Sequence, residues 1–216
     1  MSYHIIHVLG HGSGLSVDRG CLVCRTPQFP ERRAPLSDIM AVIIAARGVS
    51  FSGEVFSRIL SNNGIILHCD ECYRPCGKSL PMSSIIHSDI FSRQIAASPL
   101  LSEAIWQKVL LAKIENQMAV LDAFSADHQL GEFLQKKNPD EGNSARHYWK
   151  YYFPLFGRKS PKKRETFGAQ HPINQMLNYS YAVVSSLLHR SLIVHGLNTN
   201  LGIHHRYRFK TDPLLY

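Results

Sequence analysis

Residues 100–124 read LLSEAIWQKVLLAKIENQMAVLDAF, and at this stretch the chain changes from a β-like to a helical pattern. Apolar residues recur here at intervals of three to five positions, the spacing that places side chains along one face of an α-helix. We therefore predict a long amphipathic helix that starts near residue 100. Its predicted buried face consists of Leu101, Ile105, Val109, Ile114, Met118 and Leu121.

The residues before this helix form short β-like runs separated by turn signals. A hairpin turn is predicted at Asp18-Arg19-Gly20, and one amphipathic helix is predicted with Ser52 as its N-cap and Asn63-Gly64 as its end. The pattern predicts an α+β chain that begins with a small β-rich, sandwich-like domain at residues 1–82. The β-like runs are HIIHVL (4–9), LSVDRGCLVCRT (15–26), DIMAVIIAA (38–46) and GIILHC (64–69).

The remainder of the chain is predicted to be a linker at residues 83–99 and an all-α helical domain at residues 100–216. Pro172 suits the first turn of a helix and Gly196 suits the residue after the last turn. Between the last two helices, FGRKSPKKRETFG (156–168) carries five basic residues and is predicted to be an exposed loop. After the long helix, further helices are predicted at about 126–136, 140–152 and 172–195.

The positive charge of the chain is concentrated in its last third. The chain has 24 Lys and Arg against 16 Asp and Glu, a net charge of +8. Residues 1–145 carry 13 basic and 14 acidic side chains, whereas residues 146–216 carry 11 basic and 2 acidic ones. Such a localised excess indicates a polyanionic partner, with nucleic acid as the first candidate and an anionic membrane surface as the second.

Composition and termini narrow the class of protein further. A hydrophobic content of 44% excludes a disordered chain. The longest apolar run, 39–46, has 8 residues, whereas a membrane span needs about 20. The start MSYHIIHVLG lacks the features of a signal peptide, so we expect a cytoplasmic protein without a membrane segment. The chain stops at TDPLLY, where a helix is expected to begin, so we expect either a fragment or a truncated reading frame.

Three segments of the helical half carry polar side chains that are candidates for a site: EGNSARHYW (141–149), NQMLNYSY (174–181) and GLNTNLGIHH (196–205). Each has a plain structural explanation. Glu141 in a first helical turn is favoured by the helix dipole, and asparagines four residues apart can form a buried hydrogen-bond network. Each segment alone is therefore weak evidence of a site.

Together and in this order, the motifs E-G-x-x-A-R-x-Y-W, N-x-x-L-N-Y-x-Y and G-L-x-x-x-L-G-x-x-H resemble the CRISPR-associated integrase-endonucleases of spacer acquisition, particularly the type II form. LSVDRGCLVCR, ILHCDE and HSDIFSRQ also resemble segments of that family, so the resemblance covers essentially the whole chain. It implies a metal-dependent DNA endonuclease and integrase that inserts new spacer DNA into a CRISPR array in prokaryotic antiviral defence. The implied reaction is phosphoryl transfer, in which a DNA 3′-hydroxyl attacks a phosphodiester.

The resemblance also implies a divalent-metal site. In the family a Glu at the position of Glu141 and a His at the position of His205 bind the metal, so both are expected to be catalytic and metal-binding. His204 stands where the family usually has an apolar residue. A third acidic ligand is expected beyond Tyr216, so we expect this chain to be weakly active or inactive. A carboxylate and an imidazole suit Mg²⁺ or Mn²⁺, with the imidazole favouring Mn²⁺.

The same resemblance implies how DNA and protein partners are bound. The expected partners are double-stranded or branched DNA, a second copy of the chain in a homodimer formed through the β domain, and the family's small ferredoxin-like CRISPR-associated adaptation protein. The basic residues are expected to bind phosphates, and Tyr148 and Asn178 to line the site. The expected DNA-binding residues are Arg146, Tyr148, Lys162, Lys163, Arg164, Asn178 and Arg206.

The cysteines leave one alternative open. Cys21-x2-Cys24 and Cys69-x2-Cys72, with Cys76 behind them, have the cysteine count of a zinc ribbon. The alternative is therefore a noncatalytic nucleic-acid-binding module, in one form stabilised by zinc. Against zinc, the first pair lies within a predicted strand, which directs the two sulfurs to opposite faces. Reduced thiols are the expected state.

Overall fold

The structure is a computed structural model that describes residues 4–71, 73–82, 88–166, 168–204 and 212–215. Its contacts divide the chain into two compact units. The first unit runs to Ile95 and also contains Tyr179–Leu201, and the second contains Ala96–Asn178 and Gly202–Leu214. The contacts group the chain differently from the predicted domains, since residues 179–201 join the first unit. The domain boundaries predicted at residues 82, 99 and 216 stay a prediction. Each unit is described by itself below.

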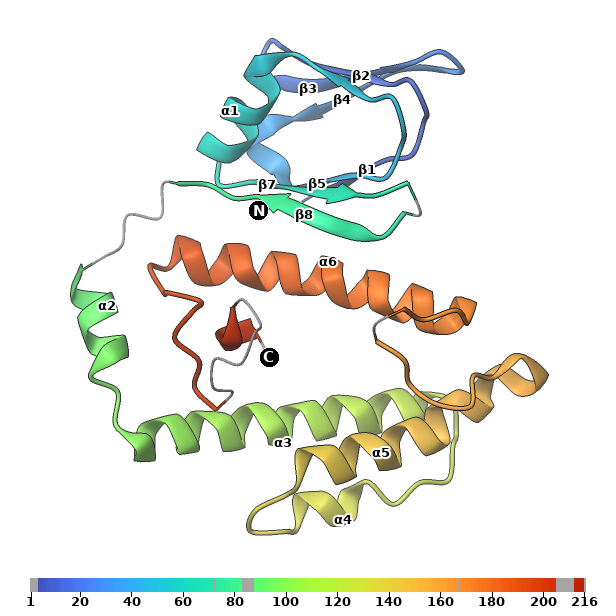
Figure 1. The fold of residues 1–216 in the computed structure, drawn as a ribbon, viewed down its shortest axis with the longest axis vertical. Helices are drawn as coiled ribbons and strands as arrows, with labels where there is room; N and C mark the ends of the chain where they lie inside the picture. The colour runs from blue at the N-terminus through green and yellow to red at the C-terminus, as the bar shows by residue number, and fades with distance from the viewer. Residues whose placement is uncertain (1–3, 72, 83–87, 167, 205–211, 216) are drawn as a thin grey trace. The chain divides into compact units, whose positions relative to one another are not determined.

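Within the described residues of the first unit, the strands form two four-stranded sheets (Figure 1). In the first sheet the first three strands are parallel and the last is antiparallel to its neighbour. Its strands lie in the order β1 (His4–Val8), β5 (Ile39–Ile44), β7 (Ile65–Cys69) and β8 (Pro75–Ser79). The second sheet has the order β4 (Phe29–Pro35), β3 (Cys21–Thr26), β2 (Gly14–Asp18) and β6 (Ser50–Phe51).

The core of this unit is formed by both sheets together with helix α1 (Gly53–Ser61). Strand β5 is buried along almost its whole length, as expected of a central strand covered on both faces. Helix α6 (Pro172–Val194) contributes to the first unit from Tyr179 onward, and its Tyr179 hydroxyl lies 3.4 Å from His7 Nδ1 on β1. The buried core residues are Val8, Leu15, Leu22, Leu36, Ile39, Val42, Ile44, Val55, Ile59 and Ile66.

Most local predictions for this half are confirmed. All four predicted β-like runs form strands, and the hairpin turn has Arg19 and Gly20 at positive φ, 48° and 75°. Helix α1 begins after Ser52 and ends before Asn63, whose φ of 59° suits a helix end. Strands β4, β6 and β8 were not predicted, because β4 and β8 contain prolines and β6 has only two residues.

The second unit is helical. It contains α3 (Pro99–Ala123), α4 (Gly131–Leu134), α5 (Glu141–Tyr152) and the 3₁₀ helix η2 (Phe153–Lys159), and α6 begins in it. Leu121, Leu130 and Tyr148 form a buried cluster, with aromatic side chains of α5 packed around it. No helix among the described residues is long and apolar enough to cross a membrane. The mixed α+β class predicted from the sequence is confirmed.

Helix α2 (Ser88–Ile95) lies within the segment predicted as a linker. Two predictions for the helical half need correction in detail. Helix α4 is shorter than predicted. The predicted buried face of α3 is wrong in its first half, since Leu101 and Val109 are 51% and 52% exposed. Trp106 and Leu110 are buried instead. Apolar residues occur on more than one side of this helix, so their spacing could not select the buried side.

Candidate metal and nucleic-acid site

Glu141, the predicted metal ligand, is the first residue of α5. Asp140 caps this helix, since its Oδ1 accepts a hydrogen bond from the Asn143 backbone N at 2.6 Å. Lys113 on α3 donates from Nζ to Glu141 Oε1 at 2.7 Å. The side chains of this pair are 40% and 33% exposed, respectively. The helix start and the lysine therefore hold the carboxylate in a position that solvent and ions can reach.

Helix α3 also contacts the segment that carries the second predicted ligand. Trp106 stacks on the His204 ring, with centroids 4.2 Å apart and planes 3° from parallel. Trp106 precedes Lys113 by two helical turns, about 10 Å along the axis. One helix therefore contacts Glu141 and the neighbour of His205. His205 itself, like Arg206, lies outside the described residues.

The carboxylate of Glu141 fits a divalent cation. It already accepts a hydrogen bond from a cationic group, and oxygen ligands are those that Mg²⁺ and Mn²⁺ prefer. Within the described ranges, no three His, Cys, Asp or Glu side chains converge as a metal centre. Glu141 and His205 therefore both stay predicted ligands, and of the two only Glu141 lies among the described residues.

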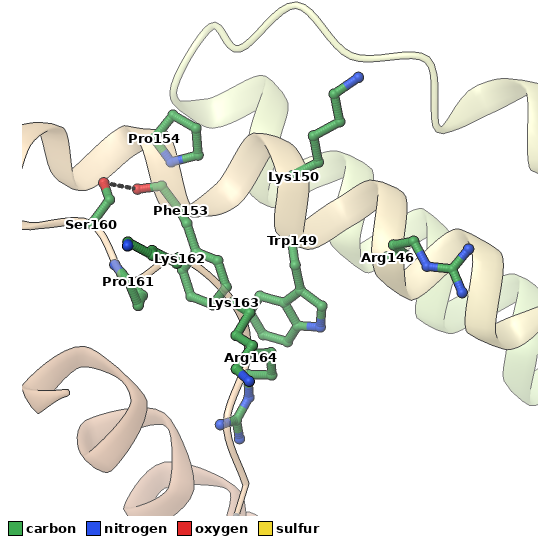
Figure 2. Close-up of a pocket in the computed structure, with 10 residues that line it drawn as sticks. All are labelled: Arg146, Trp149, Lys150, Phe153, Pro154, Ser160, Pro161, Lys162, Lys163 and Arg164. Atoms are coloured by element: carbon green, nitrogen blue, oxygen red, sulfur yellow. Dashed lines mark hydrogen bonds between the residues drawn. The ribbon is translucent and has the colours of Figure 1, made fainter. Parts of the chain in front are cut away.

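A cavity of about 530 Å³ lies between α5, η2 and the basic loop of residues 160–164 (Figure 2). Four of the lining residues share one helical face, because they lie three, one and three positions apart along the chain. They are Arg146, Trp149, Lys150 and Phe153. None of the described residues that line the cavity is acidic. Its basic residues are Arg146, Lys150, Lys162, Lys163 and Arg164.

The aromatic part of this cavity is rigidly packed. The rings of Trp149 and Phe153 stack, with centroids 5.2 Å apart and planes 19° from parallel. The Arg164 Cζ atom lies 5.6 Å from the centre of the Trp149 ring. The Ser160 hydroxyl donates to the Phe153 carbonyl oxygen at 2.5 Å (Figure 2). It also donates to the Gly157 carbonyl oxygen at 2.7 Å, and both contacts tie the start of the loop to η2.

Two asparagines of α6 hold the rest of the basic loop. Asn174 is fully buried; its Oδ1 accepts from the Glu165 backbone N at 3.2 Å, and its Nδ2 donates to the Lys163 carbonyl at 2.9 Å. Asn178 Nδ2 donates to the carbonyls of Glu165 and Thr166 at 3.3 and 2.5 Å. Both asparagine side chains thus bind the loop backbone. This agrees with the structural explanation given above for the motif of residues 174–181, a hydrogen-bond network formed by asparagines four residues apart. A contact of Asn178 with DNA stays a prediction.

The structure brings together four of the predicted DNA-binding residues, Arg146, Lys162, Lys163 and Arg164, around one cavity. Tyr148, by contrast, is 7% exposed and packs in the helical core. Its predicted contact with DNA is untested.

Sequence reasoning missed Lys113, Trp149, Lys150 and Phe153 as site residues. The last three could have been found, because they follow Arg146 by three, four and seven positions on one helix. Lys113 could not have been found in this way, since its partner Glu141 lies 28 positions away. Its sequence neighbourhood is that of an ordinary helix surface.

The positions of the cysteines disfavour the zinc alternative. Cys21 and Cys24 lie three residues apart on β3, so their side chains leave opposite faces of the sheet. Burial raises the pKa of the Cys69 thiol, with smaller contributions from Cys76 and Asp70. Cys72 lies outside the described residues.

Comparison with known proteins agrees with the sequence motifs. A family model described as "CRISPR associated protein Cas1" matches residues 6–216. A CRISPR-associated endonuclease Cas1 from Neisseria meningitidis serogroup C (strain 8013) is 29% identical over 205 residues, which cover 92% of this chain and 66% of the relative. The chain therefore spans about two thirds of the length of this curated relative.

Solved structures show the same fold. A casposase bound to its integration product has a TM-score of 0.78 and 22% sequence identity, and the match covers 100% of this chain and 68% of that one. A chain of a Cas6-RT-Cas1–Cas2 complex has a TM-score of 0.71 and 18% identity, covering 99% of this chain and 26% of that one. At these identities the likeness concerns the fold.

Proposed function

Because this chain belongs to the Cas1 family of CRISPR-associated proteins, we propose that it binds DNA and takes part in the metal-dependent insertion of new spacer DNA into a CRISPR array. One observation carries the proposal. Helix α5 holds a carboxylate at its start, Glu141, and presents Arg146 to a cavity rich in Lys and Arg five residues later. This arrangement would put an oxygen able to bind the metal and cations able to bind phosphates on one rigid element.

In the proposed reaction, a DNA 3′-hydroxyl oxygen bonds to a backbone phosphorus while the existing phosphorus–oxygen bond breaks. Glu141 and His205 would hold Mg²⁺ or Mn²⁺, whose charge would stabilise both oxygens of this displacement. In the metal-free chain, the Lys113 ammonium holds the Glu141 carboxylate through its 2.7 Å hydrogen bond. Trp106 orients the His204 side of the loop by stacking.

The basic residues of the cavity would bind the DNA backbone. Arg146, Lys162, Lys163 and Arg164 are proposed to contact phosphates, which gives affinity and position but little sequence preference. Asn174 and Asn178 contribute by fixing the loop that carries three of these residues. Since each neutralised phosphate releases counterions, DNA binding should weaken steeply as salt rises.

The protein partners are proposed from the family resemblance. The chain would form a homodimer through its β domain and bind the small ferredoxin-like adaptation protein. One of the similar solved structures is a complex that contains both Cas1 and Cas2, which supports a protein partner of this kind. Light scattering coupled to size-exclusion chromatography would measure the mass of the chain alone and with the partner.

The central experiment incubates branched DNA that carries free 3′-hydroxyl ends with the chain and Mn²⁺, and measures both strand transfer and Mn²⁺ binding. Glu141→Gln should abolish both, since the amide loses the negative charge that holds the metal. Glu115→Gln is the matched control, because Glu115 is an exposed carboxylate on α3. Equal strand transfer and Mn²⁺ binding in the Glu141→Gln protein would refute the site. DNA binding with neither strand transfer nor Mn²⁺ binding in the unaltered chain would favour the noncatalytic alternative.

A further inference from the structure

We propose that Gln94 is a positioning residue for the candidate metal site. Its side chain fixes the backbone of residues 198–201, and this segment in turn sets the place of His204 and of the predicted ligand His205. The proposal rests on the proposed function for the role of His205 as a ligand. The hydrogen bonds that carry it join residues of the first unit.

Gln94 joins two of the sequence segments that resemble the integrase-endonuclease family. It is the last residue of HSDIFSRQ (87–94), and its hydrogen-bond partners lie in GLNTNLGIHH (196–205). Gln94 and Asn198 are 104 positions apart, so only folding brings the two segments together. A side chain of α2 therefore holds the motif that carries the predicted ligand.

The Gln94 amide uses both of its donor hydrogens and its oxygen on this segment. Nε2 donates to the carbonyl oxygens of Asn198 and Leu201 at 2.8 and 3.3 Å, and Oε1 accepts from the Asn198 backbone N at 2.9 Å. The amide thus pairs with both backbone groups of Asn198, as a neighbouring strand would. A glutamate offers no donor at this place, and an asparagine is one methylene shorter. The contacts therefore require glutamine in particular.

A second anchor holds the same segment from α6. The Lys78 ammonium on β8 donates to His189 Nδ1. An ammonium has no acceptor, so Nδ1 of the neutral ring carries no hydrogen and the ring proton lies on Nε2. Nε2 then donates to the Thr199 hydroxyl oxygen at 3.3 Å, and His189 and Thr199 are each 5% exposed. Gln94 and His189 therefore hold neighbouring residues of one segment from two different helices.

The anchored segment continues directly to the ring that stacks on α3. His204 follows Leu201 by three positions, and three Cα–Cα steps span at most about 11 Å. The centre of the His204 ring lies 4.2 Å from that of Trp106, which is 9% exposed. With hydrogen bonds at one end and a stack at the other, so short a tether has little freedom left to lose when a metal binds. Fixing it in advance should favour the metal complex.

The fluorescence of Trp106 reports the position of His204 without metal or DNA. The chain has 2 tryptophans, so Trp149→Phe leaves Trp106 as the single reporter. In this background His204→Leu defines the signal of an indole that has lost the stacked imidazole. Gln94→Met keeps the length of the side chain and removes its donors and its acceptor. We expect it to move the Trp106 lifetime and its quenching by acrylamide most of the way to the His204→Leu values.

Substitutions at His189 separate hydrogen bonding from packing. His189→Leu should move the Trp106 signal in the same direction as Gln94→Met, because Thr199 loses its donor. His189→Gln should keep the signal of the unaltered residue, since the glutamine amide can donate from a place close to Nε2.

Two controls separate loss of the anchor from other effects. Gln129→Met replaces an exposed glutamine away from the segment. Ile59→Val trims a buried side chain in the core of the first unit and lowers stability without touching the segment. Both should leave the Trp106 signal unchanged, which a general response to weaker folding would not do.

Mn²⁺ binding tests the consequence for the metal, with Trp149 retained. Gln94→Met should weaken the Mn²⁺ affinity by about 10-fold, the lower end of the usual range for groups that orient a metal ligand, and Gln129→Met should not change it. An unaltered Trp106 signal in Gln94→Met would overturn the proposal, and so would an Mn²⁺ affinity equal to that of the unaltered chain. If the unaltered chain binds no Mn²⁺, the proposed function fails, whereas the Trp106 signal still decides whether Gln94 positions the segment.

Discussion

Replacing Lys113 by methionine is predicted to strengthen divalent-metal binding at Glu141. The Lys113 ammonium donates to Glu141 Oε1 at 2.7 Å, so a metal ion that binds this oxygen must displace it or lie close to it. Methionine keeps a long, flexible, apolar side chain and removes the charge together with the hydrogen-bond donor. The helix cap at Asp140 continues to hold the backbone of Glu141 in place.

The size of the effect follows from two contributions. The first is the ion pair, which is worth about 0.2–1 kcal/mol because its side chains are 40% and 33% exposed. The second is repulsion between the ammonium and a divalent ion, about 1.7 kcal/mol at roughly 5 Å in water and about half of that at physiological ionic strength. Together they amount to about 1–2 kcal/mol, or a 5- to 30-fold tighter complex.

The assay is a Mn²⁺ titration followed by electron paramagnetic resonance, which detects the free ion. It compares the unaltered chain, Lys113→Met and the control Lys108→Met, in which an exposed lysine of the same helix is replaced. The control should bind Mn²⁺ like the unaltered chain. An unchanged or weaker affinity in Lys113→Met would refute the reasoning, because it would mean that the ammonium does not compete with the metal.

The remaining predictions concern stability and pH. Asn174→Ala should lower the free energy of unfolding in urea by about 1–3 kcal/mol, since it leaves buried hydrogen-bond partners unpaired. It should also weaken DNA binding, because the Asn174 side chain acts as a clamp on the backbone of the basic loop. An unchanged DNA affinity would contradict this role of Asn174. Leu121→Ala, at a fully buried position, should cost about 2–5 kcal/mol, and a loss below about 1 kcal/mol would argue against the described helical core. Asp140→Ala should lower stability by about 0.5–2 kcal/mol through loss of the cap, whereas Asp140→Asn should cost less. Burial lowers the pKa of His147, so the imidazole binds its proton more tightly in the unfolded chain than in the folded one. The stability of the fold should therefore decline as the pH falls through about 6.5. Thermal unfolding of His147→Gln should show a flatter dependence on pH, and an unaltered dependence would contradict this role of His147.

Features that depend only on residues close together in the sequence were predictable. The turn at Asp18-Arg19-Gly20 needs positive φ at its two central positions, and glycine and polar residues mark such turns in any context. Pro172 and Gly196 likewise marked the start and end of α6, since their backbone preferences are local. The order of motifs along the chain identified the family for the same reason, because motif spacing is a property of the sequence alone.

Other features were decided only by tertiary structure. Which side of α3 is buried depends on what packs against it, and the helix offers apolar residues on more than one side: Leu101 is exposed and Trp106 is buried. Strand β4 forms despite its prolines because β3 pairs with it. Propensity and periodicity describe single elements, whereas burial and strand pairing belong to pairs of elements.

The candidate site shows the same division. The sequence by itself determined its residue types: the carboxylate of Glu141, the basic loop and the cations at helical spacing from Arg146. Only the tertiary structure paired Glu141 with Lys113, packed Trp149 on the cavity floor beside Arg164, and turned Asn174 into a clamp for the loop. These contacts join residues 11 to 28 positions apart, and chain folding alone decides which distant side chains meet.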